Sequence, residues 1–182
     1  MITDKEFLEA ELKMGISPFN QDFINLCDAT VTAIEKELKF ESVLDYGAGV
    51  GAYSDAFHKK GYNVSSYEYF KAHRDYIAEN LPHLNVISKP ITTDLLVFIE
   101  VAEHMTDKQL KAMFKKIKPN HILFSSTPNK TEGDADWGHI NIKSKEEWNT
   151  LFEKLGYEFV KNINLPTEWS IIYKLKIILN QQ

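Results

Sequence analysis

The sequence predicts a three-layer α/β fold in which a mostly parallel sheet ends in an antiparallel hairpin and is preceded by two helices. Three observations support this. Short apolar runs alternate with helical patterns through most of the chain, a glycine-rich turn joins the first run to a helix, and residues 164–167 alone separate the last two strand patterns. Parallel strands need long crossovers, normally helices, whereas so short a link joins antiparallel neighbours.

The chain begins with two predicted helices. Thr3 and Glu6 form a capping box that opens the first helix, which ends near Gly15. The second runs from about Gln21 to Leu38, with apolar residues at helical spacing. Such an extension either covers a ligand cleft or closes one face of the sheet, and the sequence leaves both alternatives open.

Strands and helices then alternate. The predicted strands span residues 43–44, 62–67, 84–87, 94–99, 121–126, 157–163 and 169–179. The predicted helices span residues 52–60, 70–80, 106–117 and 144–155, and the last two of them begin with capping boxes, Thr106 with Gln109 and Ser144 with Glu147. We therefore expect a single domain, 1–182, consisting of an N-terminal helical extension (1–40) and a core (41–182).

Composition restricts the class of protein. Hydrophobic residues make up 43% and charged residues 26%, as in ordinary soluble domains. The net charge of -5 argues against a surface that grips nucleic acid as a whole, although a local basic patch is not excluded. The single cysteine, Cys27, lies in a helical pattern, where we expect it to be a core residue, and it cannot form an internal disulfide.

No secretion signal and no membrane-spanning run is apparent in the sequence. Together with the single cysteine, this predicts a cytoplasmic protein without a membrane partner. The sequence specifies no oligomeric state.

The glycine turn is the first candidate binding element. Gly47, Gly49 and Gly51 alternate directly after Asp45, between a predicted strand and a predicted helix. Glycines let the backbone approach a ligand that any Cβ would push away, and Asp45 is close enough to meet a cationic or hydroxyl-bearing ligand. No phosphate-binding lysine follows, which excludes a nucleotide P-loop.

An acidic residue stands at the tip of the second predicted strand. Glu68 is well placed there to accept hydrogen bonds from ribose hydroxyls, and Tyr69 beside it can pack against an adenine face. The glycine spacing, with Ala52 in the last place, also fits the dinucleotide fingerprint. An NAD-binding oxidoreductase is therefore one alternative.

The segment Leu44-Asp45-Tyr46-Gly47-Ala48-Gly49-Val50-Gly51 resembles the first motif of the class I S-adenosylmethionine (SAM) methyltransferases. This resemblance implies a Rossmann-like, seven-stranded sheet and SAM as the cofactor. The implied cofactor residues are Asp45, Gly47, Gly49, Gly51, Glu68, Tyr69, Ser88 and Glu100. Many family members carry an acidic residue after the third strand to contact adenine. Here Ser88-Lys89-Pro90 follows, so Ser88 or backbone groups take that role.

A second constellation follows the fourth predicted strand. Glu100, Glu103 and His104 are spaced so that a helical turn would point all three to one side, and His139 lies after the fifth strand. Two neighbouring carboxylates repel each other unless a proton or a cation lies between them. With imidazoles added, the set suits Mg²⁺ or Mn²⁺, and zinc also. Alternatively, the glutamates merely favour the start of a helix.

Glu100-Val101-Ala102-Glu103-His104 resembles a subset of these methyltransferases that includes the ubiquinone-pathway O-methyltransferases and the small-RNA 3′-terminal 2′-O-methyltransferases. The exit Ser126-Thr127-Pro128-Asn129 is similar to theirs as well. In the RNA enzymes two glutamates and two histidines hold a metal, and by position these are Glu100, Glu103, His104 and His139. The implied acceptor is a small molecule such as a catechol, or a terminal ribose diol.

The favoured function is SAM-dependent O-methylation, with Glu103, His104 and His139 as the catalytic group, either through a metal or through a histidine acting as base. The alternatives are an NAD-binding oxidoreductase and a non-catalytic SAM-binding partner or sensor, which crowding of the cleft by the N-terminal helices would favour. The other histidines are expected to be structural at a strand start (His121) or on the surface (His58, His73 and His83).

Overall fold

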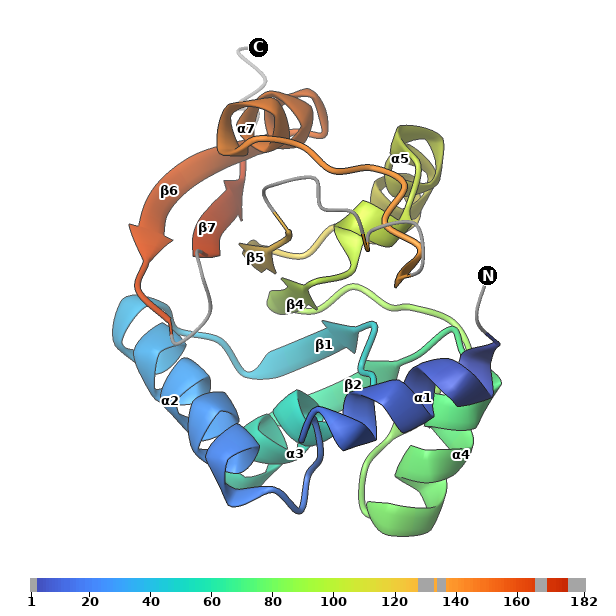
Figure 1. Cartoon of the computed structure of the whole chain (residues 1–182). Helices are drawn as coiled ribbons and strands as arrows, with labels where there is room; N and C mark the ends of the chain where they lie inside the picture. Colours follow the sequence, from blue (N-terminus) through green and yellow to red (C-terminus); the bar gives the residue numbers. More distant parts are fainter. Residues whose placement is uncertain (1–2, 128–132, 134–136, 166–169, 177–182) are drawn as a thin grey trace, which may run out of the picture.

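The fold is built on one sheet with the strand order β3-β2-β1-β4-β5-β7-β6 (Figure 1). The computed structural model describes residues 3–127, 133, 137–165 and 170–176. The strands are β1 (Ser42–Tyr46), β2 (Asn63–Tyr67), β3 (Val86–Ile87), β4 (Leu95–Ile99), β5 (His121–Ser125), β6 (Tyr157–Ile163) and β7 (Ser170–Leu175). Strands β1 to β5 are parallel, and β7 is antiparallel to both β5 and β6. The predicted sheet is confirmed.

Helices cover both faces of this sheet. They are α1 (Asp4–Lys13), α2 (Gln21–Glu37), α3 (Ala52–Lys59), α4 (Lys71–Asn80), α5 (Asp107–Lys116) and α7 (Lys145–Lys154), with a short 3-10 helix, η1 (Ala102–His104). Figure 1 shows α2, α3 and α4 on one side of the sheet and α5 and α7 on the other. The three predicted capping boxes, at Thr3, Thr106 and Ser144, are all formed.

Two large apolar clusters fill most of the space between the layers. One joins the sheet to α5 and α7 and includes the completely buried Trp148. The other joins the sheet to α2 and α3 and includes Cys27, which is 1% exposed, so its predicted place in the core is confirmed. These clusters fix the strand ends from which the candidate site is built.

Most predicted strand boundaries differ from the structure by one or two residues, and the third and last strands are the clearest cases. The third strand consists only of Val86 and Ile87, two residues fewer than predicted. The last strand ends at Leu175, where Lys176 leaves the ladder and its N–H donates to the carbonyl of Gly156. The predicted turn residues 166–167 and the predicted strand residues 169 and 177–179 lie outside the described residues.

The two N-terminal helices have different places in the fold. Helix α2 buries Cys27, Val31 and Ile34 against the sheet and thereby closes one face. Helix α1 instead lies along α4, where Nε2 of His73 is 2.6 Å from Oε2 of Glu11. The prediction that His73 is a surface residue is wrong: it is 1% exposed, because α1 covers it. No described helix is both long and apolar enough to cross a bilayer.

Asp94 holds the amino ends of three strands together. Its Oδ2 accepts hydrogen bonds from the backbone N–H of Glu41 and from both the N–H and the hydroxyl of Ser42, before β1 and at its start. Its Oδ1 accepts a bond from the side-chain amide of Asn120, next to β5. These bonds, led by the one from the Ser42 hydroxyl, lower the pKa of Asp94.

We expect Asp94→Asn to lower the free energy of unfolding by about 1–3 kcal/mol at pH 7, since an amide nitrogen cannot accept the bonds of the oxygen it replaces. A carboxyl group whose folded pKa is depressed contributes stability above its unfolded pKa of about 4, and this contribution is lost as the pH falls. Urea unfolding at pH 7 and pH 3 measures both effects. Asp75→Asn, on the exposed face of α4, is the control, and equal losses in the two variants would contradict the prediction.

Candidate functional site

The turn after β1 combines backbone geometry and open space. Gly49 has φ 52°, and no described heavy atom lies within 4 Å of the position that a Cβ would take there. At Gly51, with φ 82°, a Cβ would instead meet Leu81 at 3.0 Å and Ile77 at 3.1 Å. Gly51 therefore allows α4 to pack against the turn, whereas Gly49 leaves room for a ligand against the backbone. The N–H of Gly47 donates to the carbonyl of Tyr67.

Glu68 ties this turn to the end of β2. Its Oε2 accepts a hydrogen bond from the N–H of Gly49 at 2.9 Å, and its Oε1 accepts one from the N–H of Phe70 at 2.7 Å. The residue is only 6% exposed, so it is not a solvated loop glutamate. Each carboxylate oxygen keeps a second lone pair, with which it can accept a hydroxyl of a ligand.

Two further predicted cofactor residues follow neighbouring strands. Tyr69 comes after β2 and is 78% exposed, and its ring lies 5.6 Å from the ring of Phe70. Ser88 directly follows β3 and is exposed. Both belong to the carboxyl edge of the parallel strands, the edge at which open α/β sheets bind their ligands.

Asp45 lies inside the protein rather than at the surface of the turn. It is 3% exposed, and its Oδ2 accepts a 2.6 Å bond from the hydroxyl of Ser54, which in turn accepts a 2.7 Å bond from Ser66. Burial raises the pKa of Asp45 to about 6, against the lowering effect of the Ser54 hydroxyl. Asp45 thus connects β1 to the first turn of α3 and to β2.

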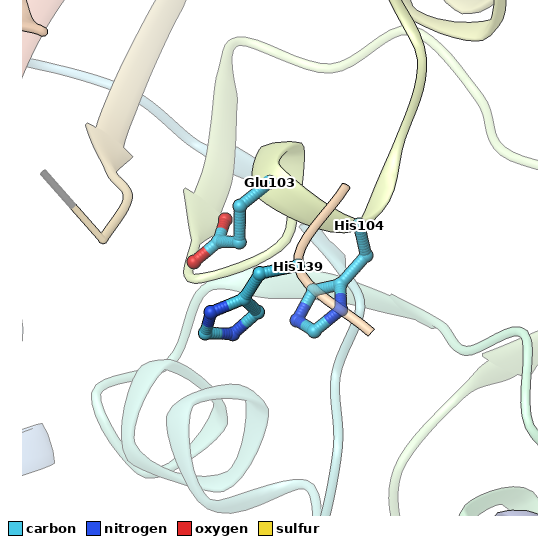
Figure 2. A group of neighbouring side chains, drawn as sticks. All are labelled: Glu103, His104 and His139. Atoms are coloured by element: carbon cyan, nitrogen blue, oxygen red, sulfur yellow. The ribbon is translucent and has the colours of Figure 1, made fainter. Parts of the chain in front are cut away.

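Three of the four predicted metal-ligating side chains gather beyond β4. Among the described residues, the possible ligand atoms of Glu103, His104 and His139 all lie within 4.8 Å of one another. Figure 2 shows the three side chains side by side, and the two imidazole rings are 4.8 Å apart at 70°. Desolvation, followed by the nearby His139, lowers the pKa of His104, which favours the neutral imidazole that binds metals and accepts protons.

The buried carboxylate of Glu103 organises this group. Its Oε2 accepts from the hydroxyl of Ser126 and its Oε1 accepts from the N–H of Thr127, both after β5. Its backbone carbonyl accepts from the N–H groups of Ile140 and Asn141. Glu103 therefore brings the segment that carries His139 against the exit of β4.

The predicted fourth ligand, Glu100, is not among the side chains whose ligand atoms lie within 4.8 Å of one another. It precedes η1 and has a left-handed backbone, with φ 52°, so the helical spacing rule does not apply to it. Its carboxylate accepts bonds from the hydroxyls of Ser125 and Thr127. Glu100 keeps one side open to solvent, yet desolvation by the surrounding protein and, after it, the charge of Glu103 raise its pKa.

The donor set of one carboxylate and two imidazoles fits a divalent metal. Around a four-coordinate zinc, ligand atoms lie about 3.4 Å apart, given metal–ligand distances of about 2.1 Å. No two of the ligand atoms here are more than 4.8 Å apart, so the side chains need only a small adjustment. Pro128 and Asn129, in the predicted exit segment, lie outside the described residues.

One aromatic residue at this group was not predicted to belong to it. The ring of Phe7, on α1, lies edge-on to the rings of His104 at 6.3 Å and Trp137 at 5.3 Å. Its only signal in the sequence is its position on the apolar face of the first helix. That signal gives no information about the partner on which the face packs.

The family model described as a methyltransferase domain matches residues 20–162. No curated protein sequence matches the chain. The similar solved structures include the methyltransferase domain of bacterial CtHen1-CN (19% identity, TM-score 0.63, 84% of this chain and 100% of that one). Another is the magnesium protoporphyrin IX methyltransferase ChlM of Synechocystis PCC 6803 with bound SAH (15%, 0.55, 84% and 81%).

The mitomycin 7-O-methyltransferase MmcR is also similar (12% identity, TM-score 0.63), and the match covers 96% of this chain. The chain spans 61% of MmcR and 55% of the pyocyanin biosynthetic protein PhzM. At these identities the similarity shows the fold alone.

The raised pKa of Asp45 makes stability depend on pH. Since the folded pKa of about 6 lies above the unfolded value of about 3.9, the folded state is most stable when Asp45 is protonated. Stability is therefore lost as the pH rises from about 4 through 6. We expect the isosteric Asp45→Asn to raise the free energy of unfolding at pH 8 by up to about 3 kcal/mol and to change it little at pH 4.

Urea unfolding at the two pH values measures this difference. Asp28→Asn, which removes the same charge from the exposed side of α2, should show no such dependence on pH. A loss of stability in Asp45→Asn at pH 8 would contradict the burial argument.

Proposed function

Because this chain belongs to the methyltransferase-domain family, we propose that it transfers the methyl group of SAM to a hydroxyl oxygen. The observation that carries the proposal is the pairing of two features at one edge of the sheet. The open backbone at Gly49 is tied to Glu68, and the group of Glu103, His104 and His139 follows the neighbouring strand β4.

The first feature is the proposed cofactor site. Gly49 gives the backbone access to the ligand, and Glu68 accepts hydrogen bonds from the ribose hydroxyls. Tyr69 packs on the adenine face and Ser88 meets its polar edge. Gly47, Gly51 and the buried Asp45 shape the turn from within, and Glu100 borders the site at the tip of β4. SAM rather than NAD is the proposed cofactor, because the matched family is one of methyltransferases.

The second feature is the proposed acceptor site. Methyl transfer is an in-line attack, so alignment of the two reactants and exclusion of water are the main contributions of the protein. An acceptor hydroxyl must also lose its proton, and the neutral imidazole of His104 or His139 can accept it. Glu103, His104 and His139 would hold a divalent metal, which when bound lowers the pKa of a hydroxyl that coordinates it.

A second candidate function has one observation in its favour. Phe7 lies against His104, and such crowding is what a SAM-binding partner or sensor without catalysis would show. That candidate predicts binding of SAM without turnover on any hydroxyl acceptor.

Calorimetry with S-adenosylhomocysteine (SAH), SAM and NADH tests the cofactor assignment. We expect SAH and SAM to bind and NADH not to bind. Gly49→Ala should weaken SAH binding about tenfold or more, because its methyl group occupies the ligand's space. The left-handed alanine is also strained by about 1–2 kcal/mol, which lowers fold stability.

The matched control is Gly61→Ala, since Gly61 also has a left-handed backbone, φ 88°, and no described heavy atom near its Cβ position, but lies between α3 and β2. It should lose similar fold stability and bind SAH like the parent. Tight NADH binding in place of SAH would refute the assignment.

Substitution of His139 tests the acceptor assignment. We expect His139→Asn to lower methylation of a catechol by roughly 10²–10⁴-fold, as for the loss of a general base, and to leave SAH binding unchanged. His58→Asn, on the exposed side of α3, should retain full activity. If a metal takes part, a chelator abolishes activity and Mg²⁺ or Mn²⁺ restores it. Activity that does not change with a chelator would exclude a metal from the reaction and leave a histidine acting as general base.

A further inference from the structure

Helix α1 is held at the candidate site by few contacts. None of its ten residues, all of them described, is buried. A helix of this length is marginal in water on its own. Its position therefore depends on what it touches. Leu8 and Leu12 pack against the cluster under α2 and α3, and the other contacts are with α4 and with the acceptor group.

The contacts with α4 are polar and specific. The carboxylate of Glu11 reaches the almost completely buried imidazole of His73 at 2.6 Å. Near the other end of the helix, Oδ2 of Asp4 accepts from the N–H of Ala72 at 3.3 Å. These two contacts, each about one turn from Phe7, fix the side of α1 that faces the acceptor group.

Phe7 is the residue that α1 presents to this group. Its ring lies near those of His104 and Trp137 and also near those of Phe70 (5.7 Å) and His73 (5.8 Å). The contacts with His104 and Trp137 are edge-on, an arrangement that aromatic rings prefer. An aromatic ligand that enters between Phe7 and Trp137 breaks the contact between their two rings but forms a new ring contact with each of them. Its entry therefore loses little packing energy.

The charge of α1 limits which ligand can enter. The helix carries four carboxylates, Asp4, Glu6, Glu9 and Glu11, against two lysines, Lys5 and Lys13. Nucleic acids are bound mainly by Lys and Arg at their phosphates. A net negative helix beside the site therefore disfavours a polyanionic acceptor.

We propose that α1 forms one wall of the acceptor site and that Phe7, together with Trp137, selects a small, flat aromatic molecule bearing a hydroxyl group rather than the end of an RNA strand. This inference rests on the proposed methyltransferase function and adds the acceptor class and a specificity-determining residue to it.

The test begins with the full chain and four acceptors in the presence of SAM: catechol, 2,3-dihydroxynaphthalene, cis-cyclohexane-1,2-diol and a short ribo-oligonucleotide with a free terminal diol. Both aromatic diols should be methylated with kcat/KM at least about tenfold above the other two. A higher kcat/KM for the oligonucleotide or for the alicyclic diol overturns the proposal.

Phe7→Ala tests the named residue. We expect a rise of about tenfold in KM for the aromatic diols, the size of one lost ring contact, with kcat and SAH affinity within about twofold of the parent. Leu8→Ala is the control, because Leu8 packs against the cluster under α2 and α3 rather than at the site. An unchanged KM in Phe7→Ala, or an equal rise in Leu8→Ala, overturns the role of Phe7.

Calorimetry with SAH distinguishes failure of the proposed function from failure of the proposed acceptor class. A chain that fails to bind SAH refutes the proposed function itself. A chain that binds SAH but neither binds nor methylates an aromatic diol refutes only the acceptor class.

Discussion

The acceptor end of the site depends on one buried residue. Glu103 is completely buried, and a buried carboxylate is very unfavourable unless it is hydrogen-bonded. Its two oxygens are satisfied by the segment after β5, and its carbonyl by residues 140 and 141. The hydrogen bonds that Glu103 needs thus hold three separate stretches of chain together: η1, the segment after β5, and residues 140 and 141. As a consequence, His139 lies against His104.

The cofactor end depends on the sheet instead. The parallel pairing of β1 with β2, which sets Tyr46 opposite Tyr67, makes both strands end at the same level. The glycine turn and Glu68 are then close enough for the Gly49 bond. The two ends of the site meet beside β4, where Glu100 and Glu103 lie close enough for the charge of one to raise the pKa of the other.

The sequence was informative wherever the determinant was local. The capping boxes depend on residues three positions apart, and the glycine turn on glycines two positions apart, so both could be predicted. The burial of His73 could not, because its partner Glu11 lies 62 residues away on a different helix. The helical spacing rule failed at Glu100 because a left-handed glutamate is uncommon and has no sequence signal of its own.

The two ends of the site also differ in how strongly stability constrains them. The cofactor end shares its residues with the buried core, as Asp45 and Ser54 show, so substitutions there alter folding and binding together. Helix α1 has no buried residue, and segments with few buried contacts open at low free energy. Residues on such a helix can change with little loss of fold stability. In such a chain, substitutions can change the residues of α1 around Phe7 while the glycine turn and Glu103 remain unchanged.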